Sequence, residues 1–165
     1  MKDALKVLFV CHGNICRSPM AESYFTWLVT RAGRADEFEI DSAATSRDDD
    51  GCTPHHGTVN VLKHHGVPVV SHHARQMTAA DARYFDLIIG MDEWNMRNMR
   101  RIAGSENADK VYKLTAFQPD GTLLNAKKAP NVADPWYSND FDTTWRDVTA
   151  GCKNLLSFVD RAYAH

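Results

Sequence analysis

Residues Leu8–Met20 read LFVCHGNICRSPM, and this stretch decides both the fold and the chemistry expected of the chain. Its apolar start predicts a buried strand that delivers Cys11 to the beginning of a tight loop. Arg17 follows after five intervening residues, and Ser18 and Pro19 suit the N-cap and first position of a helix. The backbone N–H groups of such a loop can all point inward. They would then bind a tetrahedral anion at the helix N-terminus.

The residue types within this loop fit an anion site. Gly13 permits a positive φ, and Asn14 tolerates the left-handed conformation better than most residues. The helix macrodipole and the guanidinium of Arg17 favour a bound phosphate group, and the same surroundings favour the thiolate form of Cys11. We therefore expect a nucleophilic sulfur beneath the anion. The expected phosphate-binding loop comprises His12, Gly13, Asn14, Ile15, Cys16, Arg17 and Ser18.

Length and composition indicate one globular domain spanning residues 1–165, with 44% hydrophobic and 24% charged residues. The net charge of −2 gives no general attraction to nucleic acid or to an anionic membrane. No apolar run approaches the roughly 20 residues of a membrane helix, and no signal-peptide core is present. We expect a cytoplasmic protein without membrane insertion.

Cysteine and histidine spacing argues against a disulfide scaffold and against a metal centre. The four cysteines are too few and too scattered for the former. The histidines include adjacent pairs, whose side chains usually project in different directions, and no Cys-x-x-Cys motif is present. We expect neither a metal nor another cofactor.

Apolar patterning predicts an α/β fold of a single domain. Strands alternate with helices, so we expect a three-layer, doubly wound arrangement in which helices flank a four-stranded parallel sheet. Ligands of such folds bind beyond the carboxyl ends of the strands, where Cys11 lies. The expected strands are 5–10, 38–42, 86–91 and 110–114; the expected helices are 18–32, 53–66, one capped by Asp92 and one from Phe141; a long loop covers 116–138.

A second catalytic group is expected within that long loop. A thiolate that cleaves a phosphate ester needs a proton donor for the leaving oxygen. Asp134 precedes Pro135, which biases the aspartate toward an extended conformation, and Trp136 and Tyr137 could flank a flat substrate ring. The alternative is an Asp-Pro turn with both aromatic side chains packed on the core.

Five segments in this order resemble the low-molecular-weight protein tyrosine phosphatases: VLFVCHGNICRSPMAE, IDSAATS, SHHARQMT, FDLIIGMD and VADPWY. The resemblance covers nearly the whole chain. It implies that Cys11 attacks phosphorus and becomes a phosphocysteine, that Arg17 binds the phosphoryl group, and that Asp134 acts as general acid and then general base. It implies phosphotyrosine-containing proteins or peptides as substrates, inorganic phosphate as product and no metal.

The resemblance also implies supporting roles. Ser42 and His72, with Asn14 and Ser18, match a hydrogen-bond network that holds the loop and stabilises the thiolate. Cys16 matches a redox partner that forms a reversible disulfide with the nucleophile under peroxide. Ile15 matches the aliphatic residue of tyrosine-specific members, whereas relatives that act on phosphoarginine tend to carry threonine there.

The chain departs from the family pattern in the substrate cleft. Asp48, within the run Arg47–Asp50, stands where many members have an aromatic or bulky residue. Such a charge run is either a solvated loop or a feature that shifts substrate preference toward targets with basic neighbours.

Other functions also fit parts of this sequence. A protein arginine phosphatase could use the same fold. An arsenate reductase would need further cysteines on a nearby flexible segment, and residues 75–100 contain none. A non-catalytic phosphate-binding module or a phosphocysteine carrier could keep the anion loop, but neither needs a proton donor such as Asp134.

Overall fold

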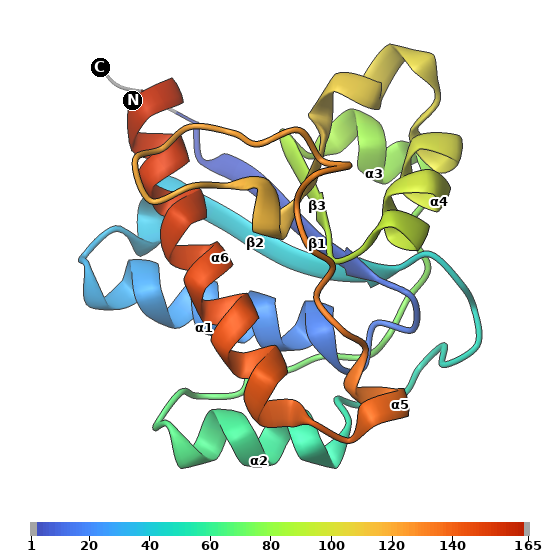
Figure 1. Ribbon diagram of the computed structural model, residues 1–165, viewed down its shortest axis with the longest axis vertical. Coiled ribbons are helices and arrows are strands. Elements are labelled where there is room, and N and C mark those ends of the chain that lie inside the picture. Colours follow the sequence, from blue (N-terminus) through green and yellow to red (C-terminus); the bar gives the residue numbers. More distant parts are fainter. Residues whose placement is uncertain (1–2, 164–165) are drawn as a thin grey trace.

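The computed structural model describes residues 3–163 and confirms the predicted α/β class, with a four-stranded, all-parallel sheet flanked by helices (Figure 1). The strands are β1 (Leu5–Cys11), β2 (Phe38–Ala44), β3 (Leu87–Gly90) and β4 (Val111–Lys113). The α-helices are α1 (Arg17–Arg31), α2 (His56–His64), α3 (Ala79–Tyr84), α4 (Glu93–Ala103), α5 (Pro135–Ser138) and α6 (Phe141–Ala162). Short 3₁₀ turns are η1 (Ala35–Glu37), η2 (Ser105–Lys110) and η3 (Leu114–Ala116).

Strand β1 is buried on both faces, which explains its continuous apolar sequence. Alternate side chains of a strand point to opposite faces, so Val7 and Phe9 enter one core and Leu8 and Val10 enter the other. The first core packs against α1, α2 and α6, and the second against α3 and α4 (Figure 1). Because β1 takes part in both cores, its carboxyl end is held firmly in the centre of the fold.

The strand order β2-β1-β3-β4 creates a crevice at the end of β1. The chain leaves β1 toward β2 on one side and later returns to β3 on the other side. Loops that follow β1 and β3 therefore diverge, and ligands of doubly wound sheets bind at such a switch point. Cys11 is the last residue of β1, and Asp92 follows closely after β3. Cys11 thus lies at the carboxyl edge of the sheet, as predicted.

Several element boundaries differ from the prediction. Strand β2 extends beyond residue 42 to Ala44. The helix expected from residue 53 begins only at His56, because the side chain of His55 accepts the Gly57 N–H and caps the helix there. The long loop expected over 116–138 ends in α5, a single turn that Asp134 caps. Asp92 caps α4, as predicted.

Helix α3 was absent from the sequence-based prediction. It lies on the face of the sheet that α4 also covers. Its signal is a capping box: Thr78 accepts the Asp81 N–H, and the Asp81 carboxylate accepts the Thr78 N–H. A six-residue helix contributes too few apolar positions for its periodicity to be recognised.

Over the described range 3–163, no helix is both long and apolar enough to cross a membrane.

Close packing between α6 and η3 depends on a glycine. Gly151 lies in the middle of α6, and a Cβ atom added there would overlap the side chain of Leu114. Leu114 is fully buried, so its side chain has no space into which to move. This contact holds α6 against the sheet layer from which the long loop departs.

We expect Gly151→Ala to destabilise the protein by about 1–2 kcal/mol, because overpacking outweighs the gain in helix propensity of roughly 1 kcal/mol. Urea denaturation of both proteins measures the difference. The control is the same substitution in a Leu114→Ala background, where the overlap is gone and Gly151→Ala should raise the stability. A stabilising effect in both backgrounds would contradict this account of the contact.

Candidate active site

Cys11 lies at the carboxyl end of β1, and its thiol is buried beneath the phosphate-binding loop. Its Sγ lies 3.0 Å from the hydroxyl of Ser18 and 3.4 Å from the backbone N–H of the same residue. The Ser18 hydroxyl already accepts a hydrogen bond from the Asn14 amide, so its own proton is free to point at the sulfur. Two donors therefore face Cys11 and stabilise negative charge on it.

Asn14 adopts the predicted left-handed conformation, with φ at 62°. Its side chain is completely buried, and both amide hydrogens are used: Nδ2 donates to Ser18 at 2.8 Å and to Ser42 at 3.0 Å. Its backbone carbonyl accepts from Nε2 of His72 at 2.8 Å. The predicted supporting residues thus converge on Asn14 and hold the turn of the loop.

Two local predictions about the loop were wrong. Ser18 is not the N-cap of α1, because the helix begins at Arg17 and Cys16 occupies the cap position. The Ser18 hydroxyl contacts Cys11 and Asn14 instead of closing the first turn. Gly13 does not take a positive φ. A side chain there would collide with the carboxylate of Asp49, so the absence of a Cβ permits close approach of the neighbouring loop.

Glu22 belongs to the same network, although the sequence analysis missed it. The buried carboxylate accepts a hydrogen bond from the Ser42 hydroxyl and lies 3.6 Å from Nδ1 of His72. Burial raises the pKa of Glu22 to about 7, against the hydrogen bond from Ser42, which lowers it. The network therefore ends on a carboxyl group that is readily protonated near neutral pH. Its position one turn after Ser18, on the same helix face, is the signal that could have identified it.

The guanidinium of Arg17 is buried at the base of the site, with 2% of its side chain exposed. Nη1 donates to Asp92 at 2.6 Å and to the carbonyl of Val132 at 2.9 Å, while Nη2 donates to Asp134 at 3.3 Å. Among the residues described, nothing accepts from the buried Nε. A buried donor without an acceptor is rare in folded proteins, and this one suits an anion in the loop.

Asp92 is a second residue whose role at the site was not predicted. From the sequence, Asp92 is predicted only as a helix cap, and its Oδ1 does accept the Asn95 N–H. Its other oxygen binds Arg17 and orients the guanidinium. The position directly after a strand that neighbours β1 could have indicated this second contact.

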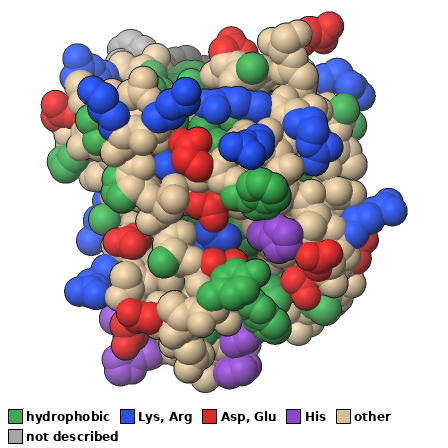
Figure 2. Space-filling model, turned by 45° about the vertical axis from the view of Figure 1, so that its right-hand side comes forward, with side chains coloured by type: hydrophobic (Ala, Val, Ile, Leu, Met, Phe, Trp, Pro, Cys, Tyr) green, Lys and Arg blue, Asp and Glu red, His purple; other side chains and the backbone are tan. Residues whose placement is uncertain are grey.

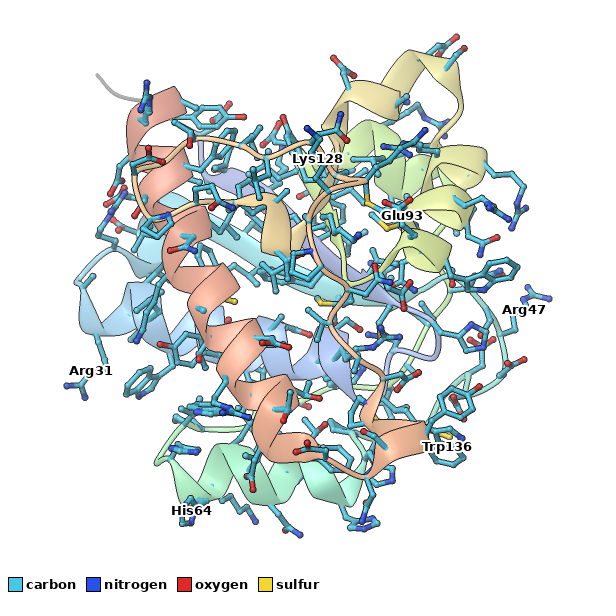
Figure 3. The ribbon with its side chains drawn as sticks, in the orientation of Figure 1. Arg31, Arg47, His64, Glu93, Lys128 and Trp136 are labelled. Atoms are coloured by element: carbon cyan, nitrogen blue, oxygen red, sulfur yellow. The ribbon has the colours of Figure 1, made fainter. Side chains whose placement is uncertain are left out.

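Asp134 has the extended backbone predicted for a residue before proline, with φ at −78° and ψ at 112°. Oδ1 accepts the Trp136 N–H at 3.1 Å and so begins α5, while Oδ2 faces Arg17. This short helix holds the carboxyl group over the loop. Figure 3 shows Trp136 projecting from α5 at the edge of the molecule.

Part of the candidate site lines one pocket at the surface. Figure 2 shows this face of the molecule, where hydrophobic, acidic and histidine side chains surround a hollow. Trp136 is 60% exposed and Tyr137 84% exposed, so the alternative in which both pack on the core is wrong. Four further predicted site residues are buried and do not belong to the lining: Arg17, Ser18, Ser42 and His72. The lining consists of Cys11, His12, Gly13, Ile15, Cys16, Asp48, Asp49, Asp134, Trp136 and Tyr137.

Cys16 differs from Cys11 in its surroundings. It is buried, and its carbonyl accepts from the Thr58 hydroxyl at 3.0 Å, which ties the loop to α2. Burial, followed by the neighbouring charges of Cys11 and Asp134, raises the pKa of the Cys16 thiol to about 12. Cys16 therefore remains protonated at neutral pH.

Comparison with known proteins agrees with this geometry. The family model described as low molecular weight phosphotyrosine protein phosphatase matches residues 6–164. Low molecular weight protein-tyrosine-phosphatase YfkJ of Bacillus subtilis is 35% identical, covering 95% of this chain and 97% of that protein. The human low molecular weight phosphotyrosine protein phosphatase is 37% identical, covering 95% of each.

Solved structures show the same relationship. The crystal structure of YfkJ superposes with a TM-score of 0.89 at 33% identity, covering 98% of each chain. The crystal structure of a Drosophila arginine phosphatase has a TM-score of 0.79 at 27% identity, covering 98% of this chain and 99% of that one. The chain, with Cys11 at the end of β1 and Arg17 at the start of α1, belongs to the low molecular weight phosphotyrosine protein phosphatase family.

Proposed function

We propose that this protein hydrolyses phosphotyrosine monoesters in proteins or peptides through a phosphocysteine intermediate on Cys11. The observation that carries the proposal is the convergence of three groups at one place. Cys11, whose sulfur faces two hydrogen-bond donors, and Asp134 both line the pocket, and the buried guanidinium of Arg17 contacts Asp134. A binding module has no use for a proton donor over its anion site, so Asp134 favours an enzyme.

In the first step, the loop N–H groups and Arg17 bind the phosphate oxygens. The unpartnered Nε of Arg17 provides one donor for this purpose. Cys11 Sγ then attacks phosphorus in line with the ester oxygen, forming the S–P bond as the P–O bond breaks. Asp134, protonated for this step, donates its proton to the leaving phenolic oxygen.

In the second step, the Asp134 carboxylate takes a proton from water. The water oxygen attacks phosphorus, the S–P bond breaks, and inorganic phosphate leaves. The donors from Ser18 stabilise the sulfur as its negative charge returns. Neither step uses a metal ion or another cofactor, so we expect the activity to survive EDTA.

The pocket lining favours an aromatic phosphate ester. Trp136 and Tyr137 stand exposed at its rim, where flat side chains can contact a phenyl ring, and Ile15 adds an apolar surface. The similarity to the Drosophila arginine phosphatase makes phosphoarginine the second candidate substrate. Rates on matched phosphotyrosine and phosphoarginine peptides decide between them, with a phosphoserine peptide as the aliphatic control.

A redox role for Cys16 forms part of the proposal. Both Cys11 and Cys16 line the pocket. Peroxide would oxidise Cys11 to a sulfenic acid, and the Cys16 thiol would then displace water to form a disulfide, which thiols reduce again. Because Cys16 stays protonated, peroxide is expected to react at Cys11 first.

We expect Cys11→Ser to abolish hydrolysis of phosphotyrosine while retaining affinity for vanadate, because the nest of N–H groups and Arg17 remain. Steady-state assays and a vanadate titration measure the two properties. Retained turnover in this variant would show that another group is the nucleophile.

We expect Asp134→Ala to slow aryl phosphates with poor leaving groups by about 10²–10⁴-fold and activated esters much less, because only the former need a proton on the departing oxygen. A plot of log kcat/KM against leaving-group pKa measures this dependence. Equal losses across the series would mean that Asp134 only shapes the loop.

We expect the buried thiol of Cys16 to resist alkylation by iodoacetamide from pH 6 to pH 9, since burial, the largest cause of its raised pKa, keeps the thiol protonated. The experiment uses Cys11→Ser protein and peptide mass mapping. Exposed Cys52 is the internal control and should be modified within the same samples. Modification of Cys16 at pH 7 as fast as Cys52 would contradict this picture.

A further inference from the structure

The loop that follows β2 is bound directly to the phosphate-binding loop. The backbone N–H and the hydroxyl of Ser46 both donate to the carbonyl of His12, at 3.1 and 2.9 Å. The Thr45 N–H donates to the Cys11 carbonyl at 2.9 Å. The Asp48 N–H donates back to the Ser46 hydroxyl at 3.3 Å. The position of the Asp48 backbone is therefore set relative to His12 by hydrogen bonds through the Ser46 hydroxyl.

The side chains of His12 and Asp48 form a pair at the pocket mouth. Nε2 of His12 lies 2.8 Å from Oδ2 of Asp48, and since a carboxylate can only accept, the ring N–H donates. The two side chains are 41% and 70% exposed, and both line the pocket. A surface pair of this kind contributes little to stability, so its value lies in fixing the orientation of the imidazole.

A second part of the pocket lining is also tied to the phosphate-binding loop. Trp136 packs its ring against the edge of His55, with ring centroids 5.7 Å apart and an interplanar angle of 85°. The His55 N–H donates to the carbonyl of Ile15 at 2.8 Å. The pocket is thus lined by an indole connected to Ile15 and by an imidazole that belongs to the loop itself.

We propose that His12, oriented by Asp48, is a specificity-determining residue whose ring contacts the substrate's phenyl ring, with Asp48 as its positioning residue. This inference rests on the proposed phosphotyrosine phosphatase function. It explains how a cleft with an aspartate at the usual aromatic position still offers a second ring to an aromatic substrate, besides Trp136. It also gives Asp48 a different role from the attraction of basic neighbours, because its Oδ2 is occupied by His12.

The first test compares kinetic constants of His12→Ala with those of the unmodified protein. For a phosphotyrosine peptide, KM should rise about threefold to tenfold, the range expected for loss of one ring contact. The inhibition constant of inorganic phosphate should stay within about twofold, because phosphate makes no ring contact. A parallel rise in both constants would mean that the variant distorts the anion site, and would overturn the inference.

The second test asks whether Asp48 acts through His12. Asp48→Ala should raise KM for the phosphotyrosine peptide in the same direction as His12→Ala, and Asp48→Asn, whose amide oxygen can accept the same hydrogen bond, should restore part of the loss. Asp50→Ala is the matched control. It removes an equal charge from the same exposed loop without touching His12, and should leave KM unchanged.

A rescue experiment separates positioning from direct contact. His12→Phe supplies a flat ring that needs no hydrogen bond, so KM should stay near that of the unmodified protein. Adding Asp48→Ala to this variant should have no further effect. If Asp48→Ala raises KM equally in both backgrounds, or only for peptides with lysine or arginine beside the phosphotyrosine, Asp48 acts on the substrate directly and the inference is wrong.

Different results would contradict the proposed function and the assignment of the ring contact to His12. Absence of Cys11-dependent hydrolysis of any aryl phosphate would remove the proposed function itself. Normal hydrolysis by the unmodified protein, with a KM insensitive to His12→Ala, would remove only the assignment of the ring contact.

Discussion

The arrangement of the site depends on one strained turn, the left-handed backbone at Asn14. An L-residue in this conformation costs roughly 1–2 kcal/mol, and asparagine less than most because its side chain bonds locally. Here four hydrogen bonds offset the cost, from the two amide hydrogens and to the two oxygens of Asn14. Without this turn the Ser18 hydroxyl would lose the partner that directs its proton toward Cys11.

Around this turn, the site is assembled from parts that lie far apart in the chain. Arg17 begins α1, yet its guanidinium is held by Asp92 after β3 and by the carbonyl of Val132. Removing one partner of a buried ion pair typically lowers the stability of a protein by about 3–5 kcal/mol, because it leaves a buried charge unpaired. These contacts therefore couple the position of the guanidinium to the packing of the long loop. The same loop carries Asp134, so the two proposed catalytic groups, Arg17 and Asp134, are placed together.

The fold followed from features that are local in sequence. The apolar run into Cys11, the cap at Asp92 and the Asp134-Pro135 pair each bias the backbone within a few residues, and the structure agrees at each of them. Helix α3 was missed because its cap was overlooked and its apolar face is short. The cap of α1 was misassigned because a serine next to a proline satisfies the local rule, whereas its hydroxyl is used by Asn14 and Cys11.

The candidate site was predictable in its residues more than in its contacts. Cys11 and Asp134 line one pocket and Arg17 contacts Asp134, as expected; Cys11 and Arg17 belong to one short loop, and Asp134 is brought to it by the long loop. The roles of Glu22 and Asp92 depend on which side chains meet across the fold, and local patterns do not report that. The pairing of His12 with Asp48 is of the same kind, since 36 residues separate them.

The burial of β1 on both faces determines how its backbone amides exchange with solvent. Amides of a central strand that takes part in both cores exchange with solvent only through near-global opening, whereas amides of a helix of one turn, such as α5, exchange through small local fluctuations. The sulfur of Cys11, at the end of that strand, is thus protected from local unfolding. Helix α5 is one turn long, and we expect it to unfold locally most readily. Motion on this side of the molecule can admit and release a bulky phosphoprotein while the proposed nucleophile, Cys11, stays in place.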